Sequence, residues 1–253
     1  MFGRSQGQTL WVDNPARIEA LNRLTYVAEQ REPFVLLRGT AGTGRTSVLL
    51  RLQERFGSTH DSAVMFNVSG MDEQTLLQQV CRSLAVTSTP SATNGTLMSA
   101  IRDEISGRVQ CRSRTILILD DLDRSREDLT PAVLFFCAVN QQTEHGITVV
   151  AAAEDSPGPK LEQLSALNVE LQDLDRSESQ EFASAVLQAS GVDPSELDSS
   201  GLAAITRFGK GSPSRLKKLC EIVSVAVRTT PDLCVTENIV DVLVTEMLLK
   251  RAG

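Results

Sequence analysis

The stretch FVLLRGTAGTGRTSVLLRL, residues 34–52, constrains the fold more than any other part of this 253-residue chain. Four apolar residues, bounded as a buried strand is, lead into Gly39, and a helical apolar pattern resumes at Arg45. Between them stands GTAGTGRT, which follows the phosphate-loop pattern G-x-x-x-x-G-K-T except that Arg45 replaces the lysine. A strand, a glycine-rich loop and a helix in this order predict one βα unit of a parallel sheet.

The residue types of this loop point to anion binding. Its three glycines allow positive φ and close backbone approach, so successive amide groups can point at one anion that the following helix dipole also favours. Arginine keeps the positive charge of lysine, but its planar group is wider, so binding survives this replacement more easily than transition-state alignment does. The alternative is a glycine-rich turn without a ligand. We expect the Thr46 hydroxyl to bind Mg²⁺ and the phosphates of ATP to lie on Gly39, Thr40, Ala41, Gly42, Thr43, Gly44, Arg45, Thr46 and Ser47.

A second candidate site follows the most apolar segment of the chain, TILILDDLDR at residues 115–124. Asp120 falls at the carboxyl end of the predicted strand, where ligands of open α/β sheets gather. We expect Asp120 to hold Mg²⁺ through water as the partner of Thr46, and Asp121 to polarise the attacking water. Taken alone, two acids after a strand are equally consistent with a solvated turn.

Strand and helix patterns alternate along the first two thirds of the chain, and only helical patterns follow. This change predicts a helical N-terminal segment at 1–30, an α/β domain at 31–175 and an all-helical domain at 176–253. Strands are expected at 34–37, 62–70, 115–124, 147–156 and 168–174.

The composition is that of a soluble globular protein, with 41% hydrophobic and 23% charged residues. A net charge of −7 argues against non-specific binding to nucleic acid or to an anionic membrane. No apolar run approaches the roughly 20 residues of a membrane span. The five cysteines form no C-x-x-C pair, and we expect them to be buried reduced thiols in a cytoplasmic protein.

The helical part carries a third signal, GKGSPSRLKKLC at residues 209–220. Gly211 is expected to end one helix and Pro213 to start the next, with Arg215 in its first turn, either solvated or directed at a ligand. Together with the phosphate loop, the strand LILDD and the leading helix NPARIEALNRLTYVAEQ, this pattern resembles the AAA+ ATPases, most of all the ExeA-type ATPases of general secretion pathways.

The resemblance implies a P-loop sheet of order 5-1-4-3-2 with a small helical lid domain, and Arg215 as the lid arginine that reaches the γ-phosphate. It also implies assembly into homo-oligomeric rings or filaments. The chain departs from the family at Glu154, where a neutral polar sensor residue of the catalytic site is usual. It also lacks an arginine before NVELQDL, for which Arg124 or Arg126 could substitute as a finger toward a neighbouring subunit.

Three functions remain open. The first is a Mg²⁺-dependent ATPase, slow because of Arg45 and Asp121, that couples hydrolysis to assembly or to remodelling of a partner protein. The second is a switch or scaffold that binds ATP or ADP and hydrolyses little. The third is a DNA-dependent ATPase of the transposition-helper kind, which the acidic composition opposes. We expect no membrane span, so any action at a membrane requires a partner protein located there.

Overall fold

The structure is a computed structural model that describes residues 11–57, 61–87, 89, 91–194, 197–230 and 233–249. Its chain separates into two compact units. An α/β unit comprises the described residues within 16–40 and 45–171, and a helical unit comprises those within 1–15, 41–44 and 172–253. Residues 1–10 of the predicted N-terminal segment lie outside the described residues.

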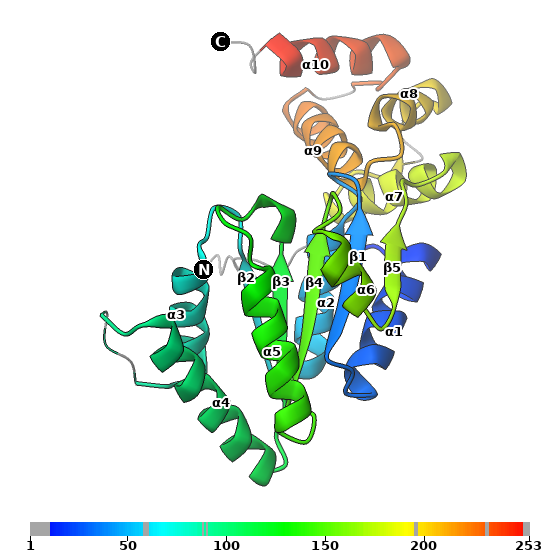
Figure 1. Ribbon diagram of the computed structural model, residues 1–253. Coiled ribbons are helices and arrows are strands. Elements are labelled where there is room, and N and C mark those ends of the chain that lie inside the picture. The colour runs from blue at the N-terminus through cyan, green and yellow to red at the C-terminus, as the bar shows by residue number, and fades with distance from the viewer. Residues whose placement is uncertain are drawn as a thin grey trace, which may run out of the picture. The chain divides into compact units, whose positions relative to one another are not determined.

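The α/β unit is built on a five-stranded parallel sheet (Figure 1). The order β2-β3-β4-β1-β5 is the expected order 5-1-4-3-2, so this fold prediction is confirmed. The strands are β1 (Phe34–Gly39), β2 (Ser62–Asn67), β3 (Thr115–Asp120), β4 (Ile147–Ala153) and β5 (Asn168–Leu171).

The burial of each strand agrees with the apolar pattern of its sequence. The three central strands β1, β3 and β4 are buried along almost their whole length, as continuous apolar runs predict for a sheet covered on both faces. The edge strand β5 alternates exposed and buried residues. Four strands end before their predicted limits, whereas β1 continues two residues beyond its predicted end. After β3 the chain turns at Asp121 into η1 (Leu122–Arg124).

Helices cover both faces of the sheet, with α5 and α6 in front and α1 and α2 behind in Figure 1. The short α6 was not predicted. The helices of this unit are α1 (Pro15–Glu29), α2 (Arg45–Gly57), α3 (Glu73–Ser83), α4 (Asn94–Gln110), α5 (Thr130–Gln142) and α6 (Pro159–Leu164).

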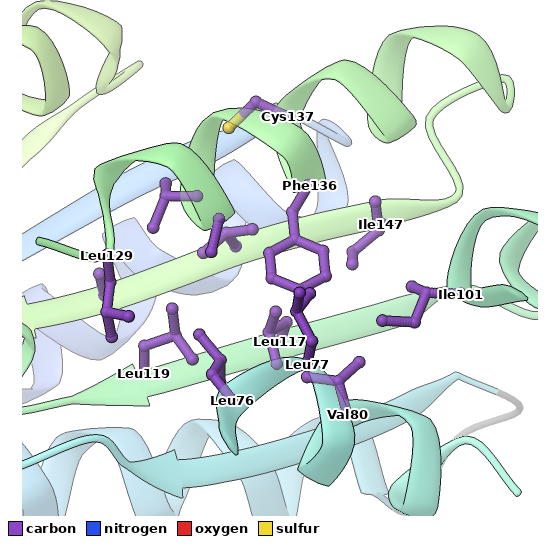
Figure 2. Close-up of a cluster of buried hydrophobic side chains, with 14 of the residues drawn as sticks. Leu76, Leu77, Val80, Ile101, Leu117, Leu119, Leu129, Phe136, Cys137 and Ile147 are labelled. Carbon is purple, nitrogen blue, oxygen red and sulfur yellow. The ribbon is translucent and has the colours of Figure 1, made fainter. Parts of the chain in front are cut away.

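One face of the sheet packs against α3, α4 and α5 through a cluster of buried side chains (Figure 2). Phe136 of α5 is fully buried and points toward the leucines of β3 and α3. Because the side chains of a strand alternate between its faces, Leu117 and Leu119 meet this cluster while Ile118 between them faces the other layer. Residues that Figure 2 labels in the cluster are Leu76, Leu77, Val80, Ile101, Leu117, Leu119, Leu129, Phe136, Cys137 and Ile147.

The helical unit has its own hydrophobic core, formed by side chains of α7 (Arg176–Ala189), α8 (Ser199–Gly209), α9 (Pro213–Thr229) and α10 (Glu237–Leu249). Asp175 and Glu178 form a reciprocal capping box at the start of α7. The Asn14 side chain donates a 2.9 Å hydrogen bond to Glu178. The helix expected to end at Gly211 ends instead at Gly209, because Lys210 takes the left-handed conformation that terminates it.

The cysteines correct one expectation. Cys81, Cys137 and Cys220 are buried as predicted, but Cys111 and Cys234 are exposed, because both lie beyond the ends of their neighbouring helices. Burial raises the pKa of the Cys137 and Cys220 thiols to about 12. Among the described residues, none of the helices combines the length and the apolar character needed to cross a membrane.

This difference in burial predicts the reactivity of the thiols. The thiolate is the reactive form, so a buried thiol of raised pKa is protected at pH 8. We expect Ellman's reagent to modify Cys111 and Cys234 quickly in the native protein and all the thiols in urea. Replacing Cys137 by Ser should leave the fast phase unchanged, whereas replacing Cys111 should halve it. A native fast phase that Cys111→Ser leaves intact would contradict the assignment.

Candidate functional site

The predicted site residues of the α/β unit gather at one edge of the sheet, because the carboxyl ends of parallel strands lie together. Asp120 ends β3, and Gly39 ends β1. The strand β4 lies between β1 and β3, with Ala153 beside Arg38 in the register. Residues that follow these three strands can therefore meet although up to about a hundred positions separate them in the sequence.

The first contact at this edge joins the loop to β3. The Thr46 hydroxyl, in the first turn of α2, donates a 2.6 Å hydrogen bond to Oδ2 of Asp120. The other carboxylate oxygen accepts the backbone N–H of Asp121 at 3.1 Å. Asp120 is almost fully buried, and this burial raises its pKa while the hydrogen bond from Thr46 opposes the rise. The two residues predicted to share a metal ion thus lie in direct contact.

Arg45 is the second point of contact. Its side chain is only 7% exposed, and its guanidinium is turned toward groups of its own unit. Nη1 donates to the backbone carbonyl of Gly39, and Nη2 lies 3.3 Å from Oδ1 of Asp121. A buried cation is costly unless it is paired and hydrogen-bonded, and these two partners meet that need.

Asp121 connects β3 to η1 in the left-handed conformation, with φ 56° and ψ 45°. Aspartate tolerates this region better than most residues, and such conformations concentrate at functional sites. Its Oδ2 accepts a 2.9 Å hydrogen bond from Nδ2 of Asn67, so both carboxylate oxygens have partners. Asn67 was not predicted from the sequence. Its signal was its place as the last residue of β2, directly beside Asp120 in the register.

Glu154, which follows β4, does not stand alone. Its carboxylate forms an ion pair with the Arg124 guanidinium, and its backbone N–H donates to Asp123 at 3.0 Å. Both partners belong to η1. The hydrogen bond with Glu154 is the main reason that the pKa of Arg124 is raised, and the charges of Asp121, Glu154 and Asp123 add to it. Asp123 is a further residue that sequence reasoning missed.

The tip of the loop, Ala41–Gly44, belongs to the helical unit. Within that unit the Gly42 carbonyl accepts the backbone N–H of Ser214 at 3.1 Å and the Ser212 hydroxyl at 3.4 Å. Gly42 has φ +91°, and a Cβ there would lie 2.5 Å from the Ser212 oxygen, so glycine is required on both grounds.

The other predicted loop residues differ in exposure. Thr40 and Ala41 are exposed, Thr43 is buried, and Gly44 and Ser47 are partly buried. Arg215 lies in the first turn of α9, as predicted, with an exposed side chain. It belongs to the helical unit.

These features agree with comparisons to known proteins. A family model described as an AAA domain matches residues 28–156, which is more than half of the chain. The chain belongs to the AAA domain family. This match spans the loop, both aspartates and Glu154, so the AAA domain contains every contact of the sheet edge described above.

Individual relatives extend this finding. The chain is similar to general secretion pathway protein A of Aeromonas hydrophila, with 29% identity over 116 residues, which are 46% of this chain and 20% of that protein. The chain thus spans about a fifth of that relative's length. The match confirms the likeness to the ExeA type that the sequence motifs indicated.

Solved structures share the fold at low identity. Cdc6p from Pyrobaculum aerophilum superposes with a TM-score of 0.74 and 14% identity, over 90% of this chain and 65% of that one. A Drosophila ORC chain, in a structure bound to DNA, gives 0.67 and 16%, over 98% of this chain and 71% of that one. At these identities the likeness concerns the architecture.

The contact between Thr46 and Asp120 yields a testable prediction. Thr46→Val keeps the shape of the side chain but removes the donor to a buried carboxylate. We expect the free energy of unfolding to fall by about 1–3 kcal/mol. We also expect ATP affinity to lose its dependence on Mg²⁺. Urea unfolding and nucleotide titration with and without Mg²⁺ measure the two effects.

Thr46→Ser is the matched control, because it keeps the hydroxyl and should preserve both properties. If the valine variant still bound ATP more tightly with Mg²⁺ than without it, Thr46 would not be a metal ligand.

Proposed function

We propose that this AAA domain binds Mg²⁺-ATP on residues 39–47 and hydrolyses it slowly, and that nucleotide state controls its assembly or its contact with a protein partner. The observation that carries this proposal is the 2.6 Å hydrogen bond between Thr46 and Asp120. It brings a hydroxyl and a carboxylate together from two chain segments that the phosphate-loop interpretation requires to meet. A glycine-rich turn without a ligand does not call for this pairing.

The residues present fit a magnesium ion. Mg²⁺ prefers oxygen ligands and is usually held by one or two carboxylates together with phosphate oxygens. Thr46 and Asp120 supply such oxygens, and the buried carboxylate of Asp120 is already oriented by two hydrogen bonds. When bound, the ion would neutralise charge on the β- and γ-phosphates. The amides of the loop and the start of α2 would hold the same phosphates.

The protein's own groups explain why turnover should be slow. For hydrolysis, Asp121 must accept a hydrogen bond from the attacking water, but its two oxygens already accept hydrogen bonds from Arg45 and Asn67. Arg45 must reach the phosphates, but its guanidinium is engaged by Gly39 and Asp121. Productive binding therefore has to exchange these internal partners for the ligand, and each exchange removes part of the gain from binding.

The same contacts favour a second candidate function, a nucleotide-dependent switch with little hydrolysis. An arginine that stays on Asp121 would keep this carboxylate from water while the loop amides still bind phosphate. The partner and the oligomer, a ring or a filament, are proposals that rest on the family. DNA is bound in the ORC structure, but that observation concerns ORC. The net charge of −7 of this chain does not favour a surface that contacts the phosphates of DNA.

Asp121→Asn tests hydrolysis. Asparagine keeps the size of the side chain but cannot act as a base toward water, so Mg²⁺-dependent phosphate release should fall by about a hundredfold or more. The amide oxygen of asparagine can still accept a hydrogen bond from Arg45, so ATP affinity should stay within a few fold of that of the unmodified protein, and this retained affinity shows that the variant is folded. Light scattering of the variant should show a greater mass with ATP than with ADP. Undiminished phosphate release in Asp121→Asn would remove Asp121 from the mechanism.

Arg45→Lys separates the two candidate functions. Lysine has one nitrogen in place of the two guanidinium nitrogens that contact Gly39 and Asp121, so we expect the contact with Asp121 to weaken and the charge to reach the terminal phosphates. We expect turnover to rise by about tenfold or more with a change in ATP affinity below about threefold. Phosphate release under single-turnover conditions measures the rate. Unchanged or lower turnover would show that arginine is already competent.

A further inference from the structure

Glu154 stands where a negative charge would oppose the proposed ligand. The register places Ala153 beside Arg38, and Glu154 follows Ala153 directly, just as Gly39 follows Arg38, so both come at the carboxyl ends of neighbouring strands. Gly39 begins the loop that is proposed to bind polyphosphate. Two like charges close together at a partly desolvated edge repel each other. An uncompensated carboxylate at this position would therefore weaken ATP binding.

The structure supplies compensation from the same chain. The guanidinium of Arg124 forms an ion pair with the Glu154 carboxylate. The neighbouring Asp123 accepts the backbone N–H groups of Glu154 at 3.0 Å and of Asp155 at 3.4 Å, which fixes the end of β4 against η1. Arg124 is therefore paired with Glu154 and is also under the influence of the nearby charges of Asp121, which Arg45 contacts as well, and Asp123.

This pair has no evident role in stability. The Arg124 side chain is 49% exposed and that of Glu154 is 27% exposed, and ion pairs of such exposure contribute little to folding. Its position after β4, the strand next to the one that leads into the loop, points instead to a role in the charge of the site. If a neutral residue stood at position 154, as is usual in the family, the site would need no positive charge from Arg124.

We propose that Arg124 is a positioning residue of the nucleotide site, which neutralises Glu154 within one chain and so makes this sheet edge compatible with a polyphosphate. The inference rests on the proposed function, since it presupposes that ATP binds at the loop. It also assigns Arg124 a role inside its own subunit, in contrast to a finger that reaches the nucleotide of a neighbour. The two roles differ in what a second substitution at Glu154 does.

The test compares Arg124→Ala, Glu154→Gln and the double variant. ATP affinity is measured in the presence of Mg²⁺ by competition against a fluorescent ADP analogue, at low and at high salt. We expect Arg124→Ala to weaken ATP binding by about tenfold at low salt, and this loss to shrink at high salt, where partly exposed charges are screened. The double variant should return to within about twofold of the unmodified protein, because the carboxylate that needed compensation is gone.

The matched control is Arg23→Ala, which removes an arginine of the same 49% exposure from its ion pair with Glu19 on α1. It should leave ATP affinity unchanged, and thermal unfolding of every variant checks that each is folded. The inference is overturned if Arg124→Ala binds ATP like the unmodified protein, or if the double variant remains as weak as the single one. The second result is the one expected of a finger toward a neighbouring subunit.

The unmodified protein separates this inference from the proposed function. If it binds ATP and the Arg124 variants behave otherwise than described, only the role of Arg124 is rejected. If it binds no ATP, the proposed function fails, and the role of Arg124 fails with it.

Discussion

The buried guanidinium of Arg45 is the constraint on which the behaviour of this site depends. A charge that is only 7% exposed must be paired and hydrogen-bonded, and the chain meets this need with the Gly39 carbonyl and the Asp121 carboxylate. Lysine at this position would reach fewer partners at once, because its ammonium is compact and lacks the planar fork. The arginine in place of the usual lysine thus changes the shape of the cation and also engages the Asp121 carboxylate in a hydrogen bond.

Much of this arrangement follows from the sequence, and the rest depends on distances between segments. Thr46 and Asp120 could be predicted to meet, because a loop motif and an acid at a strand end have defined places in a parallel sheet. Asn67 could not, since an asparagine after an apolar run carries no signal of its own and only the register of β2 with β3 places it beside Asp120. The partners of Arg45 depend on side-chain rotamers, which local patterns do not determine.

The same distinction applies to the fold. Long apolar runs predicted β1, β3 and β4, whereas the order of the strands came from the family resemblance, because periodicity within a strand does not indicate its neighbours. The six-residue α6 is shorter than two helical turns, too short for a periodic pattern to stand out. Cys111 and Cys234 were expected to be buried because free cysteines usually behave as small apolar residues, yet each follows or precedes a helix rather than lying within one.

The ion pairs Arg45–Asp121 and Arg124–Glu154 both reduce the negative charge of the sheet edge. Asp120, Asp121, Asp123 and Glu154 carry four negative charges, and Arg45 and Arg124 carry two positive ones, which leaves two negative charges in this network. A polyphosphate would approach against this charge. The attraction must therefore come from the loop amides, the start of α2 and a divalent cation. Together with the charge of Arg124, the glycines of the loop and the oxygens of Thr46 and Asp120 that would hold this cation are what allows so acidic an edge to bind an anion.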